Sequence, residues 1–215
     1  MDDNELVRLY GNTTSSFYTE RGTIYLENSE YSKAIADLQK AVSAQADPLK
    51  QDHTVRLRLS IALFRNGKIN EAKEQWRTML SHEDPARLAN DPSAHGINLL
   101  RAGRYQTGFG DLYVTPPNFN TITFGDSGAA AHLGNGLRAA SDGHYDTAMR
   151  EWQLAETCSD FFQVPHLMRG FIYQMRGQRA RAVEEWIQTL QGWDPAPPDT
   201  AGITDAQYDA MRALL

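Results

Sequence analysis

Several residue types and patterns are scarce in this chain, and each scarcity excludes a class of protein. The 215 residues include one cysteine, Cys158, so no intramolecular disulfide framework can form and a reducing compartment is indicated. The N-terminus, Met1 to Glu5, is acidic and is followed by no apolar run of signal-peptide length. We therefore expect neither secretion nor membrane insertion, and a cytoplasmic location, although processing of the chain would hide a removed leader.

Basic residues are outnumbered, and the sequence patterns of nucleotide, metal and catalytic sites are missing. The formal net charge of −6 argues against a general nucleic-acid binder, which needs a basic face to neutralise phosphates. The glycines never form a G-x-x-x-x-G-K cluster, and no two histidines stand three or four residues apart as helical zinc ligands do. We therefore expect no cofactor and no metal.

One tetrapeptide, Gly125-Asp126-Ser127-Gly128, resembles the serine-nucleophile segment of chymotrypsin-like proteases. That chemistry needs a β-barrel that brings a histidine base and an aspartate to the serine. Helical patterns flank Ser127 on both sides, so Asp126 and Ser127 are interpreted as a turn and N-cap before a helix near Ala129. The chain is predicted not to be an enzyme.

What the chain does contain is a pattern of small and bulky residues that occurs five times. A small residue is followed twelve positions later by a second small residue, and four positions after that by a bulky apolar one. Between the two small residues lies a turn, in four cases with a glycine that can adopt positive φ. The first small residues are Gly22, Ser60, Gly96, Gly136 and Gly170, the second are Ala34, Ala72, Gly108, Ala148 and Ala182, and the bulky residues are Leu38, Trp76, Leu112, Trp152 and Trp186.

This spacing resembles that of tetratricopeptide repeats, which stack as antiparallel helix pairs of about 34 residues. The resemblance covers roughly Ser15 to Pro195. It is weakest in the third unit, whose second helix is cut short by Pro116-Pro117, and the fourth unit has Ala139 where the family has a larger residue, which predicts looser packing. The resemblance implies an all-α, right-handed superhelix of antiparallel helix pairs with a C-terminal capping helix.

The domain organisation follows from the repeat. Residues 1–14 are predicted to form an N-terminal arm or short first helix, residues 15–195 the helical-repeat domain, and residues 196–215 a linker and capping helix. Tyr208, Met211, Leu214 and Leu215 stand at helical spacing, and we expect this helix to cover Trp186 and Trp193 at the end of the array.

The segment 113–128 breaks the period. It is too polar and too rich in β-branched residues for a helix, so we expect an ordered excursion whose Phe119, Ile122 and Phe124 pack on the array. A flexible hinge is the alternative. Burial of the two phenylalanines would indicate a structural plug, and their exposure a docking loop.

The resemblance places the binding surface on the first helices, which line the concave face of such arrays. Thr19 and Thr23 stand in the first unit where the chaperone-binding subclass has lysine and asparagine, which disfavours a co-chaperone role. The other positions are apolar and predict a groove for a partner helix or extended peptide. They are Leu57, Ile61, Phe64, Ile97, Leu133, Leu137, Leu167, Phe171 and Met175. A neighbouring helix, the 113–128 excursion or a twin subunit could cover them instead.

A second candidate surface is basic. Arg169, Arg176, Arg179 and Arg181 lie within the fifth unit. They are either a solvated helix face or a docking site for an acidic partner, which would weaken steeply with salt.

The sequence thus predicts a non-catalytic protein-protein interaction module, such as an adaptor, assembly factor or scaffold, that binds another protein in an apolar concave groove. An architectural subunit of a larger complex and a self-associating scaffold are the alternatives within this class. An enzyme with an unrecognised site is the alternative from another class. The partner, the pathway and the oligomeric state cannot be derived from these residues.

Overall fold

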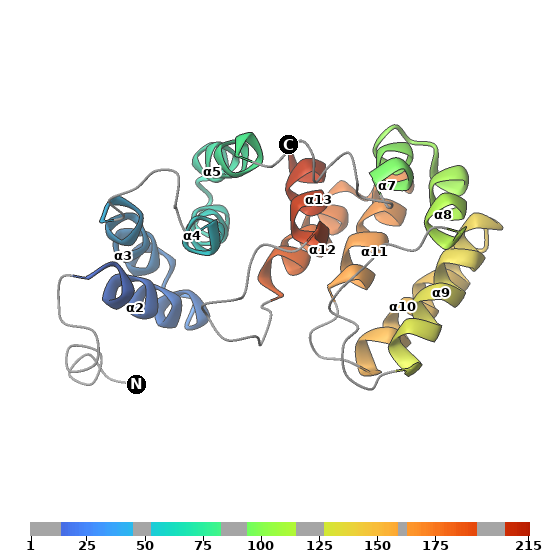
Figure 1. Ribbon diagram of the computed structural model, residues 1–215, viewed down its shortest axis with the longest axis horizontal. Helices are drawn as coiled ribbons and strands as arrows, with labels where there is room; N and C mark the ends of the chain where they lie inside the picture. Colours follow the sequence, from blue (N-terminus) through green and yellow to red (C-terminus); the bar gives the residue numbers. More distant parts are fainter. Residues whose placement is uncertain (1–13, 45–52, 83–93, 115–126, 159–162, 193–204) are drawn as a thin grey trace. The chain divides into compact units, whose positions relative to one another are not determined.

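The computed structural model describes residues 14–44, 53–82, 94–114, 127–158, 163–192 and 205–215, and these residues form eleven α-helices (Figure 1). The helices are α2 (Ser15–Glu27), α3 (Tyr31–Ser43), α4 (His53–Arg65), α5 (Ile69–Ser81), α7 (Ala94–Arg101), α8 (Tyr105–Val114), α9 (Ser127–Ser141), α10 (Tyr145–Cys158), α11 (Val164–Met175), α12 (Arg179–Gln191) and α13 (Asp205–Leu214). No strand occurs in these ranges, so the all-α prediction is confirmed for the described part of the chain.

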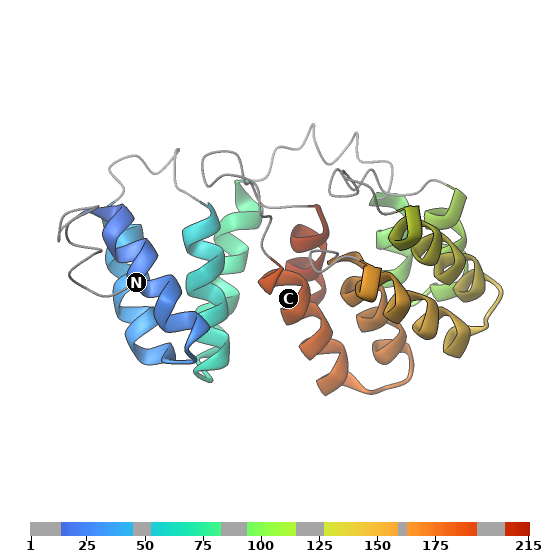
Figure 2. The same ribbon diagram turned by 90° about the horizontal axis from the view of Figure 1, so that it is seen from below.

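The chain divides into two compact units, residues 1–82 and residues 83–215. In the first unit α2 packs on α3 and α4 on α5, with α3 joining the two pairs (Figure 2). In the second unit the pairs are α7 with α8, α9 with α10 and α11 with α12, and α13 packs against α12 and α11. The five predicted helix pairs are therefore present, and a single array running through both units stays a prediction.

Each pair turns at the place the sequence indicated. The second helices begin at Tyr31, Ile69, Tyr105, Tyr145 and Arg179. In the second pair, Gly67 has a φ of 78°, and the Lys68 N–H donates to the carbonyl of Leu63 at 2.9 Å, which together form a Schellman cap. Gly103, Gly143 and Gly177 repeat this geometry, whereas Ser29 takes it in the first pair with a φ of 60°.

The core of each pair is the contact between the first small residue and the bulky residue sixteen positions later. The side chains of Trp76, Trp152, Leu38 and Leu112 are fully buried. In the fourth pair, the Trp152 indole occupies the space that a side chain at Gly136 would need. Phe109 of α8 packs on Trp152 with ring centroids 5.7 Å apart, so the tryptophan of the pair that was expected to pack more loosely is enclosed.

Helix α13 closes the second unit as predicted. Tyr208, Met211 and Leu214 are buried, and the Gln207 side chain donates to the carbonyls of Leu190 and Gly192 at the end of α12. These bonds satisfy carbonyls that a helix end leaves without partners. Leu215 is 42% exposed, so its predicted place in the buried stripe is wrong, because the helix ends at Leu214.

Several predictions fall outside the described residues. They concern the arm at residues 1–13, the packing of Phe119, Ile122 and Phe124, and the contact with Trp193. The second helix of the third pair ends at Val114, as the following prolines indicated. Searched over the described ranges, the helices include none that combines the length and the apolar character of a membrane span.

Replacing Trp152 with alanine tests the core of the fourth pair. Because the indole is completely buried, Trp152→Ala should lower the free energy of unfolding by about 3–5 kcal/mol, measured by urea denaturation. Leu154→Ala in the same helix removes a 45% exposed side chain and should change it by less than about 0.5 kcal/mol. Similar effects of the two changes would contradict this packing.

The close approach of α9 and α10 has its own test. A Cβ on Gly136 would lie 2.2 Å from Trp152 Nε1, whereas a Cβ on Gly134 would have no atom within 4 Å. Gly134→Ala should therefore stabilise the chain by up to about 1 kcal/mol through helix propensity. Gly136→Ala should destabilise it by about 1–3 kcal/mol through overpacking. The melting temperatures of the two variants measure these changes. Equal changes in both variants would contradict the close contact between α9 and α10.

Candidate functional site

The structure buries most of the side chains that were predicted to line an apolar groove. Leu57, Ile61, Ile97, Leu133, Leu137, Leu167 and Phe171 are each at most 4% exposed. Their predicted exposure is wrong, because α4, α9 and α11 each pack against more than one helix of their unit and α7 packs on α8. Phe64 and Met175 are half-buried and are the two members of the set that solvent still reaches.

Phe171 shows why the expected groove is filled. Its ring packs edge-on against Trp186 with centroids 5.6 Å apart, and α13 lies against both α11 and α12. The side chain is therefore part of the core of the last pair. In the first unit, Thr19 and Thr23 are half-buried, and their hydroxyls donate to the carbonyls of Ser15 and Thr19.

Of the four arginines predicted to form a docking surface, one is buried and three are exposed. Arg169 is buried, with 9% of its side chain exposed, so its assignment to a docking surface is wrong. Arg176 donates to Asp146 at 2.6 Å. Arg179 and Arg181 are exposed at the start of α12, where a partner could reach them.

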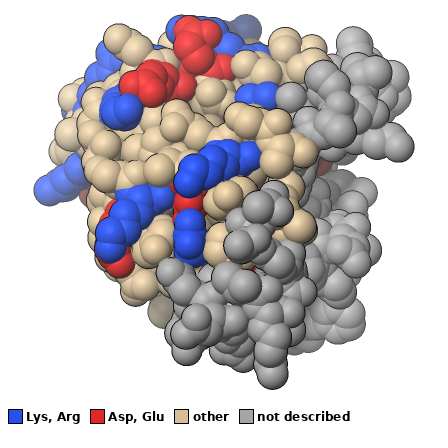
Figure 3. All heavy atoms as spheres, turned by 90° about the vertical axis from the view of Figure 1, so that its left-hand side faces the viewer, with Lys and Arg blue, Asp and Glu red and all other residues tan. Residues whose placement is uncertain are grey.

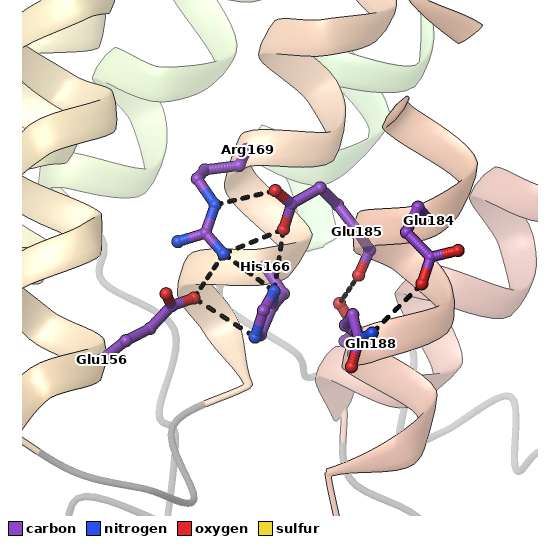
Figure 4. Close-up of polar contacts among 7 residues, drawn as sticks. Glu156, His166, Arg169, Glu184, Glu185 and Gln188 are labelled. Atoms are coloured by element: carbon purple, nitrogen blue, oxygen red, sulfur yellow. Dashed lines mark hydrogen bonds and ion pairs between the residues drawn. The ribbon is translucent and has the colours of Figure 1, made fainter. Parts of the chain in front are cut away.

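Arg169 belongs to a cluster of four charged or ionisable side chains between the fourth and fifth pairs (Figure 4). Glu156 comes from α10, His166 and Arg169 from α11, and Glu185 from α12. The guanidinium donates two parallel bonds to Glu185, from Nε at 3.0 Å and from Nη2 at 2.9 Å. The same Nη2 lies 2.5 Å from Glu156 Oε1, so one arginine connects three helices.

His166 lies between the two carboxylates of this cluster. Its Nδ1 is 2.8 Å from Glu185 Oε2, and its Nε2 is 3.2 Å from Glu156 Oε1. Both ring nitrogens of His166 are therefore engaged by polar partners.

Burial and ion pairing act in opposite directions on this cluster. For Glu185, burial raises the pKa, but hydrogen bonds from His166 and Arg169 and the arginine charge outweigh burial and leave the pKa below its usual value. For Arg169, burial lowers the pKa, and the two carboxylates more than reverse this. The contacts within the cluster therefore favour the charged forms of Arg169 and Glu185. We assign these ion pairs a structural role.

A related polar contact occurs in every pair. The residue immediately before each bulky residue accepts a hydrogen bond from the first helix, sixteen or nineteen positions earlier. The contacts are Arg21 to Asp37, Arg56 to Gln75, His95 with Asp111, His132 with Glu151, and His166 and Arg169 with Glu185. Sequence reasoning missed this row, although a polar residue before every bulky one is visible in the repeat.

These arrangements offer little to catalysis or metal binding. Within the described ranges, no group of three histidine, cysteine or acidic side chains is placed to hold a metal ion. The carboxylates best placed for acid-base chemistry, Glu156 and Glu185, are bound to Arg169. Ser127 is the first residue of α9, consistent with its interpretation as part of a helix start.

The helix pairs resemble tetratricopeptide repeats in their repeated small-to-bulky contacts and in their turns. No family model matches the sequence, and no curated protein matches it.

Solved structures of helical-repeat proteins show a distant likeness. A double mutant of MamA is 17% identical, with a TM-score of 0.34, over 82% of this chain and 93% of the other. The C-terminal part of a TPR repeat-containing protein from Cytophaga hutchinsonii is 14% identical, with a TM-score of 0.35, over 88% and 70%. A further MamA structure is 19% identical, with a TM-score of 0.29, over 80% and 93%. Scores this low carry no inference about function.

The Glu185 carboxylate gives the cluster a testable pH dependence. Its pKa in the folded state lies below the 4.5 of a free glutamate, so its stabilising contribution is complete above that value and is lost as the pH falls through the lowered pKa. The difference in unfolding free energy between the wild type and Glu185→Gln should therefore be large at pH 7 and shrink towards pH 3.

Glu184→Gln provides the control, because Glu184 is the exposed neighbour on the same helix. Its stability should follow that of the wild type at every pH. A wild-type advantage over Glu185→Gln that does not change with pH would show that the carboxylate charge is not what stabilises the cluster.

Proposed function

We propose that this chain is a non-catalytic protein-binding module, acting as an adaptor, assembly factor or scaffold. The observation that supports it is the repeated helix pair. Such pairs present side chains at regular intervals along a row of helices, and this is how repeat proteins recognise other chains. The carboxylates of Glu156 and Glu185 are both engaged by Arg169.

The accessible surface of the first helices differs from the apolar groove that the sequence suggested. In the second unit, solvent reaches polar side chains such as Asn98, Asn135 and Gln174. Among the apolar positions predicted to line the groove, those that remain accessible are Phe64 in the first unit and Met175 in the second. We infer that each unit binds a partner chain along its own first helices through polar contacts, with Phe64 as the apolar anchor of the first unit and Met175 as that of the second.

Affinity capture of the tagged full-length chain should identify a partner, and the purified partner should form a complex of defined stoichiometry in calorimetry. Phe64→Glu or Met175→Glu should weaken that complex by about tenfold or more, since an anchor at an interface centre contributes about 2 kcal/mol. The melting temperature should change little, because both side chains are already partly exposed.

Leu154→Glu is the matched control, because it places the same charge at an exposed apolar position on a second helix. It should leave the complex intact. A purified chain that forms no stoichiometric complex with any captured protein, or one that assembles with itself alone in sedimentation, would contradict the proposal.

A further inference from the structure

Exposed arginines gather at one end of the helix pairs in the second unit, beside the turns that connect each first helix to its second. We call these residues the arginine edge. All six residues are exposed, and each lies in a turn or within four residues of one. They are Arg101 and Arg104 of the third pair, Arg138 of the fourth, and Arg176, Arg179 and Arg181 of the fifth.

Contacts between neighbouring turns show that the edge is continuous. The Gln106 amide of α8 lies against the turn of the fourth pair, where a Cβ on Gly143 would stand 2.8 Å from Gln106 Nε2. Arg176 in the turn of the fifth pair bonds Asp146 at the start of α10, at 2.6 Å. The three turns therefore follow one another along one side of the unit.

Most of this positive charge has no partner inside the described part of the chain. Arg176 is paired with Asp146, and Arg181 donates to the Gln178 amide and lies 5.7 Å from the Tyr173 ring. No ion pair involves the other four in the described ranges. Four exposed and unneutralised guanidinium groups in a chain of net charge −6 form a local field that attracts anions.

The repeat itself does not require these arginines. In the first unit, Lys33 forms an ion pair with Glu30 at one turn, and Lys68 does so with Glu71 at the other. Figure 3 shows one face of the first unit, where basic and acidic side chains lie next to one another. The same turn geometry thus carries balanced charge in one unit and excess positive charge in the other.

We propose that the arginine edge binds an extended acidic segment of a partner protein. This inference rests on the proposed function and assigns a second contact surface to it. The three turns are separated by two steps of about 8–10 Å between packed helices, or roughly 16–20 Å, which an extended peptide of about five to six residues covers at ~3.3 Å per residue. Arginine is suited to this role because its planar guanidinium binds a carboxylate through two parallel hydrogen bonds.

The distribution of charge favours a peptide over a nucleic acid. Asp142 and Asp146 lie in the middle of the edge, and Asp146 already neutralises Arg176. A nucleic-acid strand brings a phosphate about every 3.4 Å and would meet these carboxylates. A peptide can place its acidic residues at the two ends of the edge and neutral residues at its centre.

Fluorescence anisotropy with the full-length chain tests the proposal. The probe is a labelled peptide of about ten residues with glutamates at both ends and neutral residues at its centre, and its glutamine counterpart is the uncharged control. The glutamate peptide should bind, and its affinity should fall when the salt is raised from about 50 to about 200 mM, because exposed charges are screened. The double variant Arg104→Glu with Arg181→Glu should weaken binding by roughly tenfold or more.

The first unit supplies a control with the same change of charge. Lys68 precedes its second helix as Arg104 does, and Lys33 is the third residue of its helix as Arg181 is. The double variant Lys68→Glu with Lys33→Glu should leave peptide binding unchanged. Equal losses in the two double variants would show an effect of net charge alone and would overturn the proposal.

Two further probes decide the class of partner. An oligothymidylate of about ten nucleotides and vesicles containing phosphatidylserine should bind more weakly than the glutamate peptide, and tighter binding of either would overturn the proposal. If the partner from affinity capture binds the Arg104→Glu, Arg181→Glu variant with unchanged affinity, the arginine edge is not a contact surface, while the proposed function stands. The proposed function fails separately, if no stoichiometric protein complex forms.

Discussion

The contact on which the structure depends is that of a small residue in the first helix with a bulky residue in the second. In the fourth and fifth pairs, Gly136 and Gly170 leave the space that Trp152 and Trp186 occupy. In the second pair, Ser60 takes the same place and accepts a hydrogen bond from Trp76 Nε1 at 2.7 Å. Burial of these large side chains supplies the hydrophobic free energy that holds each pair together. The turns, the helix lengths and the polar contacts of each pair all bring the small and the bulky residue together.

Next to each bulky residue stands a polar one that binds back to the first helix. Where the polar residue is buried, as Asp37 is in the first pair, it must find a partner, and the contact then fixes the register in which the two helices meet. In the fifth pair the contact extends through Arg169 to Glu156 of α10 and so ties one pair to the next. Arg169, which the sequence suggested as part of a docking surface, instead stabilises the packing between these two pairs.

The repeat geometry also separates structural positions from those available for binding. Positions that face neighbouring helices are filled by apolar side chains such as Leu137 and Phe171, which leaves no open apolar groove at these sites. The turns between helices constrain the backbone but leave neighbouring side chains free to vary. This freedom explains how the turns of the second unit can carry four arginines that form no ion pair within the described residues, while those of the first carry lysines in ion pairs.

The sequence by itself determined the helix pairs, their turns and the residues at their cores. These features depend on local conformation and on spacing within one pair. In the fourth pair, for example, Gly143 indicates the turn, and Ala148 and Trp152 indicate the core. It could not determine the candidate surfaces. Whether Leu57 or Arg169 is exposed depends on which helices cover it, and that coverage involves residues far away in the chain. Only the tertiary structure placed α13 against α11 and Glu156 beside Arg169, because packing between pairs leaves no periodic signal in either partner.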